Sequence, residues 1–266
     1  MTPQEHKQAA ENLLKAEETQ QQAGLLTLQY PNINMDDAYA IQSEILALKQ
    51  AQGRRVIGWK IGLTSKAMQA ALNIDIPDSG ILFDDMAFES GCTVPNGRFI
   101  QPRIEVEIAF VMKSPIGGKD VTRDAVVAAT DYVTPAIEIL DTRIVRQDKA
   151  TGEARKIFDT ISDNAANAGI VTGNAKHAID AFDLRRVGAI TFCNNEVEET
   201  GLGAGVLNDP VESVVWLARR MADYNQQIEP GHIILSGSFI RPLECPSGTH
   251  IHADFDDFGQ VDVTFA

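Results

Sequence analysis

The sequence contains few cysteines and no long apolar segment. Three cysteines occur among 266 residues, and no pair has the CxxC spacing: Cys92, Cys193 and Cys245. This pattern is typical of reduced thiols and excludes a disulfide framework. No stretch approaches the roughly 20 apolar residues of a membrane span, and the polar N-terminus lacks the apolar segment of a signal peptide. We therefore expect a soluble, cytoplasmic protein.

Positive charge is also scarce. Lys and Arg number 23 against 37 Asp and Glu, which gives a formal net charge of −14 at pH 7. A surface of this sign repels nucleic-acid phosphates and anionic lipids, and no basic run interrupts it. We therefore exclude nucleic acid and membrane as partners. An anionic substrate would require local positive charge from a metal ion, a lysine or an arginine.

The first fifty residues predict helices. Between Asn34 and Gly53 apolar residues recur at spacings of three and four: Ala38, Ile41, Ile45 and Leu48. Asn34 suits the N-cap position, and Gly53 suits the end of the helix. The length of the chain fits one large domain with a smaller appendage. We expect an N-terminal helical region, residues 1–53.

The remainder, residues 54–266, predicts a β-rich catalytic domain. The alternating, β-branched segment VIGWKIGLTS indicates a strand, after which Thr64 opens a short helix that carries Met68 and Leu72. Short β-like runs separated by turn residues follow, and strands return at the C-terminus, where DDFG resembles a hairpin turn. Helices and strands segregated in this way indicate an α+β fold.

Two further helices and one long loop are expected inside this domain. One helix begins at Thr122, and the other runs from Asp209 to about Gln227, since Asp-Pro-x-Glu is typical of a helix start. Residues 141–167 are charged and rich in Asn and Asp, which predicts an irregular segment. A loop of this length is usually functional or mobile.

The strongest local pattern is RIEVEIAF. Successive side chains of a strand point to opposite faces, so Glu105 and Glu107 share a face about 7 Å apart. A half-exposed strand with an acidic outer face is one interpretation. The run continues apolar on both faces, however, which indicates a buried strand, where unpaired carboxylates are costly. Such acids need a cation, and oxygen ligands suit a hard ion such as Mg²⁺.

A third acid, Glu138, lies in the apolar run PAIEILD. A carboxylate paired within the core is one interpretation of it. The other is a third ligand beside Glu105 and Glu107. Three acids would leave an octahedral Mg²⁺ ion room for water or for a bidentate ligand.

Lys60 is the expected positive partner of these acids. In VIGWKIG it shares a strand face with Gly58 and Gly62, and glycines beside a lysine leave space where a ligand can approach the backbone. A solvated strand lysine is the alternative. Asp78, in IPDSG, is a weaker catalytic candidate, because an aspartate in this context is also typical of a plain turn.

Other chemical fingerprints are weak or missing. His250 and His252 share a strand face, a spacing that can bind transition metals, but no cysteine or further histidine is near them in sequence. This favours a satisfied strand pair. The segment GLGAG lacks the βαβ context of a dinucleotide site, and no P-loop lysine occurs. The sequence has no GxSxG, so an esterase triad has no nucleophile elbow.

Several segments, in order, resemble the hydratase and decarboxylase branch of the fumarylacetoacetate hydrolase superfamily: GWKIGLTS, IPDSGILFDDM, RIEVEIAFVM, PAIEILDTR, FDTISDNAANAG and IILSGSFIRP. The resemblance covers essentially the whole chain. It implies a mixed β-sandwich roll with an N-terminal helical region, and we expect a homo-oligomer. Related C–C hydrolases use a histidine–glutamate pair on a lid, and no histidine lies between Lys60 and Glu105, which argues against hydrolysis of a diketone.

The resemblance also implies roles for the candidate residues. The family's three carboxylate ligands of a Mg²⁺ or Mn²⁺ ion correspond to Glu105, Glu107 and Glu138. Its catalytic lysine and aspartate correspond to Lys60 and Asp78. The implied activity is metal-dependent hydration of a 2-oxoenoate dicarboxylate in the catabolism of aromatic compounds. Decarboxylation of a related oxoenoate, hydration of a shorter monocarboxylate, and a small-molecule binding module without metal remain alternatives.

A dicarboxylate substrate requires a cation or hydrogen-bond donors at its distal end, because a buried unpartnered carboxylate is costly. The candidates are Arg155 and Lys156 in the charged loop, with Ser238 and Arg241 in or beside the SGSF segment. The alternative for each basic residue is that it only offsets neighbouring acids on the surface.

Overall fold

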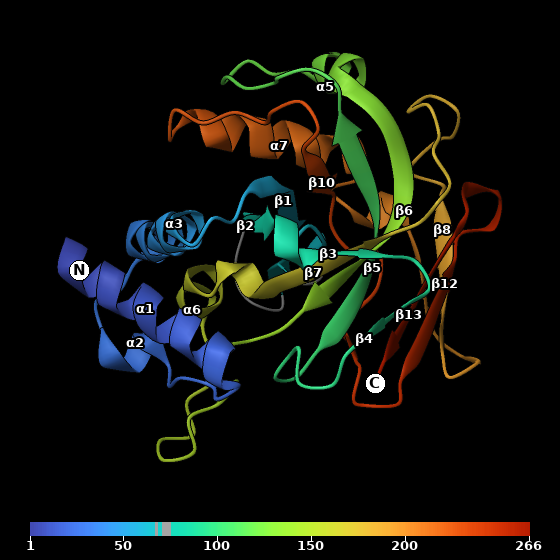
Figure 1. Ribbon diagram of the computed structural model, residues 1–266. Coiled ribbons are helices and arrows are strands. Elements are labelled where there is room, and N and C mark those ends of the chain that lie inside the picture. The colour runs from blue at the N-terminus through green and yellow to red at the C-terminus, as the bar shows by residue number, and fades with distance from the viewer. Residues whose placement is uncertain (67–68, 71–75) are drawn as a thin grey trace.

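The structure is a computed structural model and describes residues 1–66, 69–70 and 76–266. Met68 and Leu72, which the sequence predicts in a short helix, lie outside the described residues. Helices and strands segregate as expected for an α+β protein: the N-terminal helices lie on one side of the molecule, the smaller sheet lies on the other, and the larger sheet runs between them (Figure 1). No helix in the described ranges is long and apolar enough to span a membrane.

The N-terminal region forms the three helices α1 (Pro3–Thr19), α2 (Leu26–Gln29) and α3 (Met35–Ala51). Asn34 caps α3 as predicted, because its side chain accepts a hydrogen bond from the Asp37 N–H. The helices bury a core of their own, which also takes Ile144 from the later part of the chain. The division of the chain at residue 53 stays a prediction.

The larger sheet has eight strands among the described residues, in the order β2-β1-β10-β5-β6-β7-β3, with β11 paired to β5. Parallel and antiparallel pairs both occur, so the sheet is mixed. Its strands are β1 (Val56–Gly62), β2 (Asp78–Phe83), β3 (Ala87–Glu89), β5 (Arg103–Met112), β6 (Thr130–Leu140), β7 (Asn167–Thr172), β10 (Ile233–Leu235) and β11 (Leu243–Glu244).

The smaller sheet has the order β4-β13-β12-β8-β9. The predicted C-terminal hairpin is present, with β12 and β13 joined through a 3-10 turn at Asp256–Phe258. Apolar side chains from both sheets and from helix α7 (Pro210–Ala222) form the main core. The strands are β4 (Cys92–Val94), β8 (Gly188–Cys193), β9 (Glu196–Leu202), β12 (His250–Asp254) and β13 (Gln260–Phe265).

The helix predicted at Thr122 is α5 (Arg123–Ala129), and Thr122 caps it. The predicted end of the next helix is wrong. Helix α7 stops at Ala222 because Asn225 adopts the left-handed conformation, with φ of 54°, and lets the Gln226 N–H donate back to the Met221 carbonyl.

The prediction of an irregular segment over residues 141–167 is also wrong in part. This stretch contains helix α6 (Ile157–Ser162) and a 3-10 turn at Asn164–Ala166. Buried Asp159 holds the start of α6, since its carboxylate accepts hydrogen bonds from the Lys156 N–H and from the backbone and hydroxyl of Thr27.

Candidate metal centre

Three predicted acids meet on one face of the larger sheet. Strands β5 and β6 are antiparallel neighbours, and their register sets Glu105 directly opposite Glu138, while Glu107 follows Glu105 on the same face. One carboxylate oxygen from each acid lies within 4.8 Å of the other two. Glu107 and Glu138 are fully buried, and Glu105 is half-buried. The interpretation of a solvated acidic strand face is therefore wrong.

The acids are incompletely satisfied by the protein. Glu107 Oε2 accepts a hydrogen bond of 2.6 Å from the Gly237 N–H, but Glu107 Oε1 and both Glu138 oxygens are buried with no hydrogen-bond partner among the described residues. Burial and mutual repulsion raise the pKa of Glu107 well above its usual range, and raise the pKa of Glu105 to about 8. Buried, unpartnered carboxylate oxygens at this spacing fit a hard divalent cation.

Lys60 reaches the same face from β1. Its Nζ atom lies 3.6 Å from Glu138 Oε1 and 3.9 Å from Asp78 Oδ1, and all three side chains are buried. Burial alone would lower the pKa of Lys60, but the carboxylates of Glu138 and Asp78 outweigh it and raise the pKa above its usual value. The lysine is therefore an ammonium ion beside the triad, and it is not a solvated surface residue.

Asp78 is a buried residue at the start of β2, where it pairs with Gly62 of β1. Burial raises its pKa, while the nearby Lys60 ammonium opposes the shift. Its Oδ1 atom has no hydrogen-bond partner in the described part of the chain. Asp78 therefore lies in the same buried group as Lys60, and the interpretation as a plain turn residue is wrong.

The two glycines beside Lys60 differ in what they accommodate. A Cβ atom on Gly62 would lie 2.2 Å from Asp78 Oδ1 and 2.9 Å from Lys60 Nζ, so the glycine makes room for this pair. A Cβ atom on Gly58 would instead lie 1.8 Å from the Ile233 carbonyl oxygen of the neighbouring strand β10. Open space for a ligand beside Gly58 is therefore a wrong expectation.

Sequence reasoning missed two asparagines that fix this region. Asn164 bonds to β2 as another strand would, because its Oδ1 accepts from the Ile81 N–H and its Nδ2 donates to the Ile81 carbonyl. Asn167 Nδ2 donates to the same carbonyl. The Asn164 carbonyl lies against Gly80, whose missing side chain also leaves space for the Lys60 stem. The polar run SDNAAN was the available signal.

The candidates for the distal carboxylate lie in different settings. Lys156 and Arg241 form exposed ion pairs, with Glu153 and with the acids of strand β9 respectively. The Ser238 hydroxyl donates to the Ile240 carbonyl and accepts from the Ile240 N–H, so a local turn occupies it. Arg155 differs, because its Nη1 atom is buried and has no partner among the described residues.

The histidine pair does not assemble a second metal site. His252 Nδ1 lies 2.8 Å from Asp262 Oδ1, and His250 Nε2 lies 3.8 Å from the same oxygen. In the described ranges, the glutamate triad is the one group of three ligand side chains at metal-binding spacing. The interpretation of the histidines as a satisfied strand pair is the one that their contacts support.

The fold is a mixed sheet roll with N-terminal helices, and its buried carboxylate triad beside a lysine could hold a divalent metal ion. No family model matches the chain. It is 48% identical over 260 residues to 2-oxo-hept-4-ene-1,7-dioate hydratase of Escherichia coli, covering 98% of this chain and 97% of the relative. It is 37% identical over 265 residues to 2-keto-4-pentenoate hydratase of Paraburkholderia xenovorans, and this alignment covers 100% of this chain and 96% of that relative.

Among solved structures, 4-oxalocrotonate decarboxylase from Pseudomonas putida G7, complexed with magnesium and adipate, superposes with a TM-score of 0.94. The two sequences are 32% identical, and the alignment covers 100% of this chain and 99% of that one. The chain therefore belongs to the hydratase and decarboxylase branch of the fumarylacetoacetate hydrolase superfamily. The α+β roll that the motifs imply is confirmed.

Proposed function

We propose that this protein is a metal-dependent hydratase that adds water to 2-oxohept-4-ene-1,7-dioate to give 4-hydroxy-2-oxoheptane-1,7-dioate, in the degradation of homoprotocatechuate or 4-hydroxyphenylacetate. The observation that carries the proposal is the buried triad of Glu105, Glu107 and Glu138 beside Lys60. Identity to the relative named for the seven-carbon dioate is 48%, compared with 37% to the relative named for 2-keto-4-pentenoate.

The triad would hold Mg²⁺ or Mn²⁺. The donor set supports this, because it consists of carboxylate oxygens alone, which hard cations prefer. The similar decarboxylase structure contains magnesium. When bound, such an ion polarises the 2-oxo carbonyl and supplies the positive charge that an acidic protein needs to bind an anion.

Lys60 and Asp78 would assist the proton transfers of the reaction. In the substrate the alkene must first move from C4–C5 to C3–C4, which transfers a proton from C3 to C5; water then adds at C4 and a proton returns to C3. Negative charge develops on the 2-oxo oxygen while C3 lacks its proton. The Lys60 ammonium lies beside the triad and can stabilise that charge, and the unpartnered Asp78 Oδ1, 3.9 Å from Lys60 Nζ, can hold a proton in transit.

The experiment that tests the proposal measures turnover of candidate oxoenoates with and without Mg²⁺. We expect loss of the seven-carbon substrate without release of CO₂, no turnover after chelation, and recovery with Mg²⁺. Release of CO₂ from 4-oxalocrotonate would instead identify a decarboxylase. Full activity in a metal-free preparation would refute the metal role, and a ligand bound equally well with and without metal, with no turnover, would indicate a binding module.

The assembly is also part of the proposal. Large apolar side chains are exposed on the smaller sheet at Ile190, Val197 and Leu202, and β9 is an edge strand of that sheet. Such exposure supports a homo-oligomer that covers these side chains. Sedimentation equilibrium measures the oligomeric state, and a monomer at all concentrations would contradict this part of the proposal.

A further inference from the structure

Two arginines, Arg103 and Arg155, each have a buried guanidinium nitrogen without a hydrogen-bond partner among the described residues. Arg103 precedes Glu105 by two residues on β5, so the regular register of this strand puts both on the same face, about 7 Å apart along the chain. Arg103 Nε and Arg155 Nη1 are buried and have no hydrogen-bond partner, and neither guanidinium makes an ion pair with any residue that the structure describes. Both side chains are half-buried.

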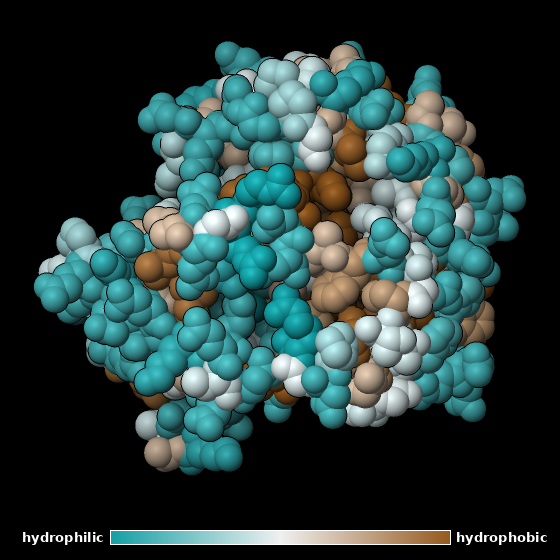
Figure 2. Space-filling model, in the orientation of Figure 1, coloured by the Kyte–Doolittle hydropathy of each residue, from teal (hydrophilic) through white to brown (hydrophobic). Residues whose placement is uncertain are grey.

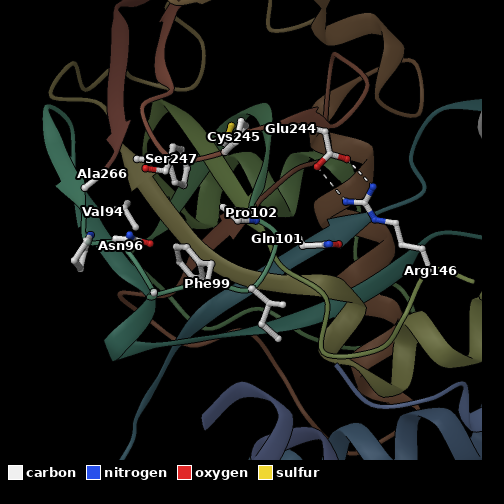
Figure 3. A pocket seen from close by; sticks show the side chains of 15 residues that line it. Val94, Asn96, Phe99, Gln101, Pro102, Arg146, Glu244, Cys245, Ser247 and Ala266 are labelled. Atoms are coloured by element: carbon white, nitrogen blue, oxygen red, sulfur yellow. Dashed lines mark hydrogen bonds and ion pairs between the residues drawn. The ribbon is translucent and has the colours of Figure 1, made fainter. Parts of the chain in front are cut away.

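Three carboxylates act on Arg103 electrostatically, and each has other partners; the first, Glu105, belongs to the triad. Glu244 stands opposite Arg103 in the β5–β11 register, but both its oxygens bond to Arg146, at 2.6 and 3.2 Å (Figure 3). Asp141 accepts hydrogen bonds of 2.8 Å from the backbone N–H groups of residues 100 and 101. Neither acid is therefore free to neutralise Arg103.

The same holds around Arg155. Its backbone N–H donates to the carbonyl of Arg146, whose side chain pairs with Glu244, the residue opposite Arg103 in the β5–β11 register. The buried carboxylate of Asp163 is the acid that acts most strongly on Arg155, but it accepts hydrogen bonds from the backbone and side chain of Arg143. Burial lowers the pKa of Arg155, and the neighbouring Arg103 lowers it further. Neighbouring arginines that each leave a buried guanidinium nitrogen without a partner are suited to binding an anion.

The distance fits the substrate class. Five carbon–carbon bonds of about 1.5 Å separate C2 from C7 in a seven-carbon 2-oxo dicarboxylate, an extended span of roughly 6 Å. This matches the spacing of about 7 Å between neighbouring positions on one strand face. A dicarboxylate whose 2-oxo end binds at a cation on the triad would therefore extend its distal carboxylate toward Arg103 when it lies along β5.

We infer that Arg103 and Arg155 form the subsite for the distal carboxylate and set the preference of the enzyme for dicarboxylate over monocarboxylate substrates. The inference rests on the proposed function and adds the residues that decide its substrate class. Arg103 is the member that the sequence did not reveal, because an arginine two residues before an acid on a strand is common on solvent-exposed sheets.

The test compares five single variants: Arg103→Gln, Arg103→Lys, Arg155→Gln, and the matched controls Lys156→Gln and Arg241→Gln. Each control removes one positive charge from an exposed ion pair. The readout is kcat/KM for the seven-carbon dicarboxylate and for 2-hydroxypentadienoate. We expect Arg103→Gln and Arg155→Gln to lower kcat/KM ten- to a hundredfold for the dicarboxylate only, mainly through KM. The controls should keep the wild-type preference, and Arg103→Lys should recover part of it.

Equal losses on both substrates, or no loss on either, would overturn the inference while leaving the hydratase proposal intact. If the wild-type protein hydrates neither substrate, the proposed function fails, and calorimetry with Mg²⁺ and a saturated seven-carbon 2-oxo dicarboxylate still decides the subsite. Wild type should then bind this probe at least tenfold more tightly than it binds the matching monocarboxylate. Retention of that ratio in both Arg103→Gln and Arg155→Gln would refute the assignment, and the charge-retaining variant Arg103→Lys shows whether a loss in Arg103→Gln is due to the missing charge.

Discussion

Replacing Glu107 by glutamine should have opposite effects on the metal-free and the metal-bound protein. The Glu107 carboxylate is fully buried, and its ligand oxygen lies within 4.8 Å of those of Glu105 and Glu138. Two unit charges at that distance repel by roughly 3 kcal/mol at an effective dielectric constant of about 20. Burial and these neighbours raise the pKa of Glu107, so without metal the fold must either protonate the acid or bear the repulsion.

The glutamine variant removes this cost and keeps the shape of the side chain. Its amide oxygen can still accept the hydrogen bond from the Gly237 N–H. We expect the metal-free variant to be about 1–3 kcal/mol more stable than the metal-free wild type, somewhat less than the full Coulomb term because protonation already relieves part of it. For a chain of this size each kcal/mol raises Tm by about 2–4 °C. Metal affinity and activity should both fall, since one of three anionic ligands is lost.

Thermal unfolding after treatment with a chelator measures the first effect, and calorimetric titration with Mg²⁺ measures the second. Glu11→Gln serves as a control, because Glu11 is exposed on α1 and the substitution changes the net charge by the same amount. Its Tm and metal affinity should match the wild type. A metal-free Glu107→Gln protein less stable than wild type, with unchanged Mg²⁺ affinity, would refute the reasoning that these carboxylates are held together for a cation.

Three other outcomes are expected. Lys60→Ala should reduce turnover at least about 10²-fold, as for loss of a positioned proton-transfer group, and activity within a few-fold of wild type would show that Lys60 is structural. The pKa of Glu105 is about 8 in the folded protein and 4.5 ordinarily, so between these pH values the folded state binds more protons than the unfolded state. The Tm of the metal-free protein should therefore fall as pH rises through this range. Saturating Mg²⁺ should reduce that dependence on pH. Arg143→Ala should lower unfolding free energy by about 3–5 kcal/mol in denaturant titrations, because it leaves the buried Asp163 carboxylate without its partner; a change below 1 kcal/mol would contradict the ion pair's structural role.

The ligand strand was predictable because its pattern is local. Alternation alone puts Glu105 and Glu107 on one face, and the apolar run around them signals burial. Glu138 was identifiable as a buried acid, but its position opposite Glu105 depends on the β5–β6 register, which involves residues more than thirty positions apart. The motif resemblance supplied that association, which the spacing of residues within one segment cannot supply.

The features that the sequence did not reveal depend on contacts across the chain. Asn164 substitutes for a strand partner of Ile81, 83 residues earlier, and the polar run around it does not show which segment it binds. Helix α6 is short, and its start is held by a bond between Asp159 and Thr27 across 132 residues. Gly58 looked like space for a ligand, but it is required for close approach of the β10 backbone, which only the sheet order shows.

The charges of the centre also indicate why the site needs both a cation and arginines. Four buried or half-buried carboxylates, on Asp78, Glu105, Glu107 and Glu138, face the single ammonium of Lys60, so full ionisation leaves three uncompensated negative charges. A dianionic substrate cannot enter such a centre until a divalent cation has offset two of them. Even then the distal carboxylate of the substrate would add a further negative charge without a partner. Figure 2 shows a largely hydrophilic surface over the N-terminal helices and an apolar patch near the middle of the same face. In the proposed subsite the compensation for the distal carboxylate comes from Arg103, two residues before Glu105 on β5, and from the neighbouring Arg155.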